Sequence, residues 1–282
     1  MLIFIIMNYK NLVKQIISEI IQDQMTPTMK YYAFDWDDNL MYMPTSIRLK
    51  DDEGNTVGMT TRDFAEYRDL VGKEPFEYEG HTIVGPAKDA YVEFGVTHDK
   101  QFLIDAMKSP IGPAWDDFVE AVNNGSIFAI VTARGHTPSV LKNAVYNLIQ
   151  KNMHGLNKEE LVKNLRKYRD IAEEEDLSDD ELIKTYLEMC KWHPVTFGEG
   201  SAANPEELKV SAMREFMNYV KVLSQRLQEK AYMKNKISNY FTPYIGFSDD
   251  DLKNVQTMKK HFDDESGLDI YHTGGGKKTK FE

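Results

Sequence analysis

The sequence predicts an α/β fold built around a central parallel sheet. Short apolar runs of β-forming residues alternate along the chain with segments of helical periodicity. Three of these runs end in clusters of polar residues, which begin at Asp35, Thr132 and Ser248. Ligands of open parallel sheets bind at the carboxyl ends of the strands, so the clusters predict a site as well as a fold.

The chain begins with an amphipathic segment. Its first seven residues are apolar, and between Leu12 and Ile21 apolar residues recur at helical spacing. This pattern predicts a helix within residues 1–28, which either docks on the domain or binds a membrane surface, a partner or a second copy. The apolar run is too short for a transmembrane span, and it lacks the basic start and cleavage site of a signal peptide.

The first predicted strand, residues 31–34, comes directly before Asp35. A hairpin follows over residues 47–61, with its turn near Gly54. Residues 62–112 mix aromatic residues with Gly and Pro, and their pattern assigns no element.

A helix, a strand and a second helix are expected next. The first helix covers residues 115–122 and the strand residues 127–131. The second helix runs to about Lys151, with Thr137 as its cap and Pro138 in its first turn.

Charged helices fill residues 157–191, and Ser178 with Glu181 forms a capping box for the second of them. Another helix begins at Asn204 as its cap. Three further strands are expected over residues 194–197, 244–247 and 268–271, and residues 274–282 are expected to form a flexible tail.

The length, net charge and cysteine content of the chain limit the classes of protein to which it can belong. A chain of 282 residues is long enough for one large domain or for a core with an insert. Its net charge of −11 excludes a protein that coats nucleic acid by electrostatics alone. The single cysteine, Cys190, allows neither an intramolecular disulfide nor a Cys-based zinc site, which fits a reducing compartment.

Carboxylates dominate two of the polar clusters. Asp35 and Asp37 are two positions apart and share a side where the chain is extended. Together with Asp249 and Asp250 they form an oxygen-rich set that suits Mg²⁺, which relieves carboxylate repulsion and screens an anionic phosphate. One carboxylate can then act as a nucleophile and another as a general acid and base, while a hydroxyl such as that of Thr132 holds phosphate oxygens.

The same clusters carry a family resemblance. In order they read Phe34-Asp35-Trp36-Asp37-Asp38-Asn39-Leu40, Ile130-Val131-Thr132-Ala133-Arg134, Lys209 in a helix, and Gly246-Phe247-Ser248-Asp249-Asp250-Asp251. The set and order of these motifs resemble those of the haloacid dehalogenase-like (HAD) hydrolase superfamily over about residues 30–273. The motifs are also similar to those of HAD-type proteins from phage and viral genomes.

The resemblance implies a Rossmann-like HAD core with a central parallel sheet, a β-hairpin flap and a small cap or helical insertion. The expected organisation is an N-terminal helix over residues 1–28 and a core over residues 29–282. Within the core, residues 41–112 would form the flap or cap and residues 152–193 the charged helical insertion, and either insert could cover the site.

By the same resemblance, Asp35 is the nucleophile and a Mg²⁺ ligand. Asp37 is the general acid and base and binds Mg²⁺ through its backbone carbonyl, and an acidic residue there marks the phosphatase branches. Thr132 bonds a phosphate oxygen, and Lys209 stabilises the negative charge on Asp35 and the phosphoryl group. The metal shell is completed by Asp249 and Asp250.

Three positions leave alternatives open. Asn39 stands where the family usually has Thr or Val, which alters the first turn. Three consecutive acids leave the register of the last motif open, so Asp251 could replace one of its neighbours. Lys209 competes with Lys191 and Lys221 on neighbouring segments.

Arg134 lies two residues after Thr132, where a guanidinium can make paired hydrogen bonds to a second phosphate or a sugar–phosphate backbone. This placement is similar to that in the phosphatase domain of phage and eukaryotic polynucleotide kinase-phosphatases. The segment Gly274-Gly275-Gly276-Lys277 lacks the spacing of a kinase phosphate loop, so no kinase domain is expected.

The sequence therefore predicts a Mg²⁺-dependent phosphatase that hydrolyses a phosphomonoester through an aspartyl-phosphate. Its substrate would be a nucleotide, a phosphorylated nucleic-acid end or a small metabolite, and its expected location is the cytoplasm, that of the host if the protein is viral. Two rivals stay open. One is a non-catalytic HAD-like binding or virion assembly protein that joins a partner or a second copy through residues 1–28, and the other transfers phosphate to an acceptor other than water.

Overall fold

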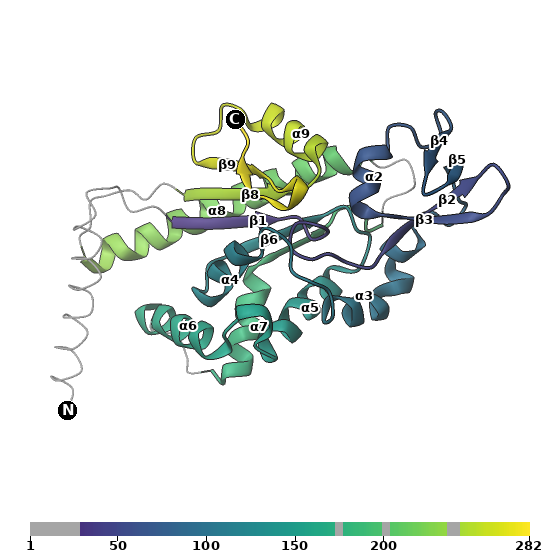
Figure 1. Ribbon diagram of the computed structural model, residues 1–282. Helices are drawn as coiled ribbons and strands as arrows, with labels where there is room; N and C mark the ends of the chain where they lie inside the picture. The colour runs from purple at the N-terminus through teal and green to yellow at the C-terminus, as the bar shows by residue number, and fades with distance from the viewer. Residues whose placement is uncertain (1–28, 173–176, 199–203, 236–242) are drawn as a thin grey trace.

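The computed structural model describes residues 29–172, 177–198, 204–235 and 243–282 (Figure 1). The amphipathic helix predicted for residues 1–28 lies outside the described residues, so its docking stays a prediction. Among the helices of the described segments, none is both long and apolar enough to cross a membrane.

A six-stranded, mostly parallel sheet forms the centre of the molecule, which confirms the predicted α/β class. Its strand order is β10-β9-β8-β1-β6-β7, and only β10 runs antiparallel to its neighbour. The strands are β1 (Met29–Phe34), β6 (Phe128–Thr132), β7 (Lys191–Pro194), β8 (Pro243–Asp249), β9 (Leu268–His272) and β10 (Thr279–Lys280). The central position of β1 agrees with its apolar side chains, since Tyr31 and Ala33 are buried on one face and Phe34 on the other.

Helices cover both faces of this sheet. Successive side chains of β1 point to opposite faces, so the strand contacts helices on each side. The Tyr31 hydroxyl lies 2.9 Å from Ser224 Oγ of α8 on one face, and Phe34 packs edge-on against Phe118 of α4 on the other. The helices around the sheet are α4 (Trp115–Asn123), α5 (Pro138–Gln150), α6 (Lys158–Ala172), α7 (Asp179–Met189), α8 (Pro205–Asn235) and α9 (Leu252–Phe262), with short 3₁₀ turns η3 (Met153–Gly155) and η4 (Gly274–Gly276).

A second, four-stranded antiparallel sheet lies between β1 and α4 in the sequence, with the order β3-β2-β5-β4. It confirms the predicted hairpin, whose turn places Gly54 at a φ of 86°. Figure 1 shows this small sheet beside the end of the central sheet toward which β1 runs. Its elements and those that follow it are β2 (Ser46–Asp51), β3 (Thr56–Thr60), α2 (Thr61–Tyr67), β4 (Phe76–Tyr78), β5 (His81–Pro86), η1 (Val92–Phe94), η2 (Val96–His98) and α3 (Asp99–Ala106).

The charged segment after α5 forms two helices, as predicted, and the capping box of Ser178 and Glu181 is present. Both helices lie against the central domain, because their apolar positions belong to the main core, among them Leu161, Leu165, Leu182, Ile183 and Leu187. The remaining acidic positions form the outer face of these helices.

Three local predictions differ from the structure. The strand expected over residues 194–197 lies upstream as β7, because its residues 191–194 pair with β6 and a turn from Phe197 N to Pro194 O follows. Residues 274–282 form η4 and β10 instead of a flexible tail, since β10 pairs with β9. The Thr137 hydroxyl makes no capping bond to its helix, because it donates to Asp99 Oδ2 at 3.0 Å.

Candidate active site at the carboxyl edge of the central sheet

The parallel pairing of β1 with β8 brings two of the predicted motifs together. Phe34 lies opposite Ser248 in the register, and the Asp35 amide donates to the Ser248 carbonyl at 2.9 Å. Asp35 and Asp249 therefore leave adjacent strands at the same edge of the sheet, where parallel strands present their carboxyl ends.

Three carboxylates converge at this edge. Ligand atoms of Asp35, Asp249 and Asp250 all lie within 4.8 Å of one another, so the three could hold a metal ion. The side chains of Asp35 and Asp249 are 6 % and 0 % exposed, so solvent screens little of their mutual repulsion.

Lys209 of α8 lies between two of these carboxylates. Its Nζ donates to Asp35 Oδ1 at 2.9 Å and to Asp249 Oδ2 at 2.7 Å, and its side chain is 1 % exposed. The competing lysines are elsewhere: the Lys191 ammonium lies 3.9 Å from the centroid of the Tyr219 ring, and Lys221 pairs with Glu265. Among the three candidates, Lys209 is the one that contacts the carboxylates.

Burial and charge shift the pKa values of this cluster. Desolvation, opposed by the Lys209 ammonium, raises the pKa of Asp35 to about 8, and desolvation with the Asp249 charge raises the pKa of Asp250 well above its ordinary value. Burial acts to lower the pKa of Lys209, but Asp249 and Asp35 outweigh it and leave that pKa raised. One ammonium thus faces three carboxylates, a surplus of negative charge that a divalent cation would neutralise.

The structure separates the roles of the three consecutive acids. Asp249 Oδ1 accepts from the Asp251 amide and from Asn254 Nδ2, each at 3.0 Å. Asp251 is the N-cap of α9 and pairs with Arg68 at 2.7 Å. Among the described residues, no hydrogen bond reaches the Asp250 carboxylate, so its oxygens are available to a ligand.

Asn39, the departure from the family pattern, ties the first motif to its surroundings. Its amide nitrogen donates to the Asp35 carbonyl at 2.9 Å and to Ser248 Oγ at 3.1 Å, and its amide oxygen accepts from Thr273 Oγ1 at 2.8 Å. The side chain is fully buried, so these bonds fix the turn that carries Asp35. Thr273 and Asn254 are not among the predicted site residues, because nothing in the local sequence marks either as a partner of the motifs.

Asp37 lies outside the group of three carboxylates. Both of its oxygens accept from Arg134, Oδ2 from Nε at 2.8 Å and Oδ1 from Nη2 at 2.5 Å. Thr132 is buried at the end of β6, and its Oγ1 accepts from the Arg134 amide at 3.4 Å. The side chain of Asp37 is 13 % exposed and keeps access to the edge of the sheet.

Arg134, the predicted substrate-binding residue, lies buried beside Asp37. We expected its guanidinium to bind a second phosphate or a sugar–phosphate backbone, but its residue is 1 % exposed and Asp37 takes the paired hydrogen bonds. Its Nη2 also donates to Thr45 Oγ1 at 2.8 Å, and its Nη1 lies 3.2 Å from His136 Nε2. The guanidinium is thus buried inside the site, where its paired hydrogen bonds go to Asp37.

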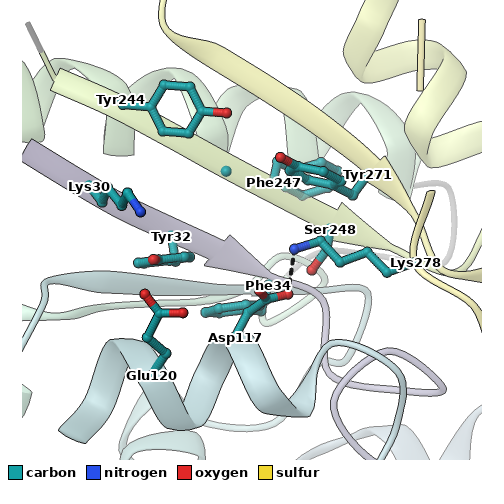
Figure 2. A pocket seen from close by; sticks show the side chains of 11 residues that line it. Lys30, Tyr32, Phe34, Asp117, Glu120, Tyr244, Phe247, Ser248, Tyr271 and Lys278 are labelled. Atoms are coloured by element: carbon teal, nitrogen blue, oxygen red, sulfur yellow. Dashed lines mark hydrogen bonds and ion pairs between the residues drawn. The ribbon is translucent and has the colours of Figure 1, made fainter. Parts of the chain in front are cut away.

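A pocket of 390 Å³ lies on one face of the central sheet (Figure 2). Its lining includes Gly246 of β8 and the rings of Tyr32, Tyr244 and Tyr271. Lys278 pairs with Asp117 at 2.5 Å along one side. Its lining contains none of the predicted catalytic residues, because these leave the strands beyond it.

Comparisons of the chain with models of protein families, with curated proteins and with solved structures found no match.

Proposed function

We propose that the protein is a Mg²⁺-dependent phosphomonoester hydrolase of the HAD type, which works through an aspartyl-phosphate on Asp35. The observation that supports this proposal is the convergence of Asp35, Asp249 and Asp250 around the buried Lys209. The order of the motifs along the chain supports the same reaction class.

The donor set fits Mg²⁺. Carboxylate oxygens are hard ligands, and those of Asp35 and Asp250 carry the charge that Lys209 leaves uncompensated. When bound, Mg²⁺ supplies charge neutralisation and orients the phosphate oxygens. Asp249 fits a supporting role, since its oxygens already accept from Lys209, Asn254 and the backbone of Asp251.

Asp35 fits the nucleophile because one of its oxygens accepts from Lys209 and the other remains for attack. In the first step an Asp35 oxygen forms a bond to phosphorus, the ester oxygen leaves, and Asp37 gives that oxygen a proton. In the second step Asp37 takes a proton from water, the water oxygen bonds to phosphorus, and the bond to Asp35 breaks to release phosphate. Lys209 stabilises the negative charge in both steps, and Thr132 is placed to bond a phosphate oxygen.

The inserted sheet fits the role of a flap or cap. Thr61 of α2 donates to Asp38 of the first motif, and Arg68 bridges Asp251 and Glu206 at 2.7 and 2.8 Å. These contacts join the insert to the carboxyl edge, where it would exclude water from a substrate. The substrate class is a nucleotide, a phosphorylated nucleic-acid end or a small metabolite.

The test is release of inorganic phosphate from an aryl phosphate, measured with Mg²⁺ and with a chelator. Wild type should release phosphate only with Mg²⁺, and Asp35→Asn should release none. Asp263→Asn is the matched control, because Asp263 lies at the other end of α9 with a 66 % exposed side chain and is outside the three-carboxylate group. Equal activity of wild type and Asp35→Asn would refute the assignment, and no release from any phosphate ester would favour a non-catalytic binding protein.

A further inference from the structure

A chain of buried polar side chains leads from Asp37 to the first turn of α3. Arg134 contacts both oxygens of Asp37, its Nη1 lies 3.2 Å from His136 Nε2, and His136 Nδ1 lies 2.9 Å from Asp99 Oδ1. Asp99 also accepts from the Thr137 hydroxyl at 3.0 Å. The chain connects the β1 and β6 loops of the core with a helix of the insert.

The donors and acceptors of this chain have one consistent assignment. A guanidinium nitrogen can only donate, so His136 Nε2 accepts from Arg134. The ring proton then lies on Nδ1, which donates to Asp99. The imidazole is therefore neutral, in agreement with a pKa that burial and the Arg134 charge both lower.

Aromatic rings enclose the guanidinium. The Arg134 Cζ lies 4.9 Å from the centroid of the Phe94 ring and 5.0 Å from that of Phe102, and the Phe102 ring also packs on His136 at 4.7 Å. Arg134 and His136 are 1 % and 0 % exposed, so no solvent competes for their hydrogen bonds. The faces of the guanidinium are held by rings and its edges by polar partners, which leaves it one orientation.

We propose that His136 and Asp99 are positioning residues that orient Asp37 through Arg134. Bonds to Arg134 use two of the roughly four lone-pair sites of a carboxylate, so Asp37 keeps the others for a substrate oxygen or water. Without His136 and Asp99 the guanidinium loses the contact on its far edge, and the carboxylate turns with it. The role rests on the proposed function of Asp37 as general acid and base, in which small displacements cost large factors in rate.

The first test compares an alkyl phosphate, whose poor leaving group needs a general acid, with an aryl phosphate, whose good leaving group needs none. The parameter is kcat/KM, which covers the steps up to transfer to Asp35. We expect His136→Leu and Asp99→Ala to lower kcat/KM for the alkyl phosphate by about tenfold or more, and for the aryl phosphate by less than about threefold. Asp99→Asn, which keeps an acceptor for the imidazole, should restore most of the rate, and Asp105→Asn on the same helix is the control.

A double-mutant cycle separates positioning from general loss of structure. Once Asp37→Asn has removed the acid, adding His136→Leu should change kcat/KM for the alkyl phosphate by less than about twofold. Equal losses for the two esters, or losses that multiply in the Asp37→Asn background, would overturn the proposal.

A second measurement does not depend on catalysis. The Nε–H of Arg134 is buried and bonded to Asp37, so NMR of the full chain should find it protected from exchange with solvent. His136→Leu and Asp99→Ala should abolish this protection, and its retention in both variants would overturn the proposal. If wild type hydrolyses neither ester with Mg²⁺, the proposed function fails, while the exchange data still decide whether His136 and Asp99 hold the Arg134–Asp37 pair.

Discussion

Replacing Lys209 by methionine is the perturbation with the largest expected effect on stability. The substitution keeps the length of the side chain in α8 and removes the ammonium that lies between Asp35 and Asp249. The two carboxylates stay buried and lose their shared donor. Such a change breaks a buried ion pair and leaves unpaired charge behind.

The contacts set the expected magnitude. The Lys209 ammonium donates hydrogen bonds of 2.9 and 2.7 Å, and a hydrogen bond that involves a charged group is worth about 1.5–3 kcal/mol. Removal of one partner of a buried pair costs about 3–5 kcal/mol, so we expect the free energy of unfolding at pH 8 to fall by about 4 kcal/mol. The loss should be smaller at pH 5.5, because protonating a buried carboxyl costs about 1.4 kcal/mol less for each unit of pH.

The assay is urea unfolding of wild type and Lys209→Met at both pH values in the absence of divalent metal. Lys221→Met is the matched control, since Lys221 lies in the same helix, is 47 % exposed and pairs with Glu265 at 3.3 Å. A surface pair of this kind contributes about 0–1 kcal/mol. Equal losses for Lys209→Met and Lys221→Met would show that Lys209 does not compensate the buried carboxylates, as would a loss that grows toward low pH.

Three further predictions concern the metal, its ligands and the turn that carries Asp35. Because the native state retains a proton at Asp35 between the ordinary pKa of 3.8 and about 8, the stability of the metal-free chain should fall as pH rises through this interval. Mg²⁺ should therefore raise the melting temperature more at pH 8 than at pH 5.5, and an equal rise at both would contradict the account. Asp250→Asn should weaken Mg²⁺ binding in titration calorimetry by at least about tenfold, whereas Asp251→Asn should not, and the reverse order would show that the register is different. Gly112→Ala should cost about 2 kcal/mol or more in urea unfolding, because its Cβ would lie 2.5 Å from the Asn39 carbonyl oxygen, and unchanged stability would show that this turn can shift.

The sequence was sufficient for the parts of the fold that local pattern decides. Apolar runs that stop at polar clusters marked β1, β6 and β8, because strands buried on both faces need continuous apolar residues. Long-range pairing decided the rest. β7 and β10 are edge strands whose positions depend on β6 and β9. The elements within residues 62–94 pack around a separate small core, whereas α3 packs in the main core.

The candidate site likewise contains some residues that the local pattern predicts and others that depend on long-range contacts. The carboxylates at Asp35, Asp249 and Asp250 follow from strand ends, whereas the cap role of Asp251 depends on where α9 begins. The partner of Arg134 lies 97 positions away, so no local pattern could have assigned it to Asp37. The sequence did contain a signal for the row of buried polar side chains behind Asp37. His136 stands two positions after Arg134 in a loop of alternating small and polar residues.

The most direct test of the central claim is chemical trapping of the intermediate. The protein is mixed with an aryl phosphate and Mg²⁺, quenched during turnover, and mapped by mass spectrometry for an acid-stable, base-labile phosphoryl group. We expect this group on Asp35 in wild type and its absence in Asp35→Asn. Release of phosphate during turnover with no phosphoryl group on Asp35, or with one on another carboxylate, would contradict this expectation.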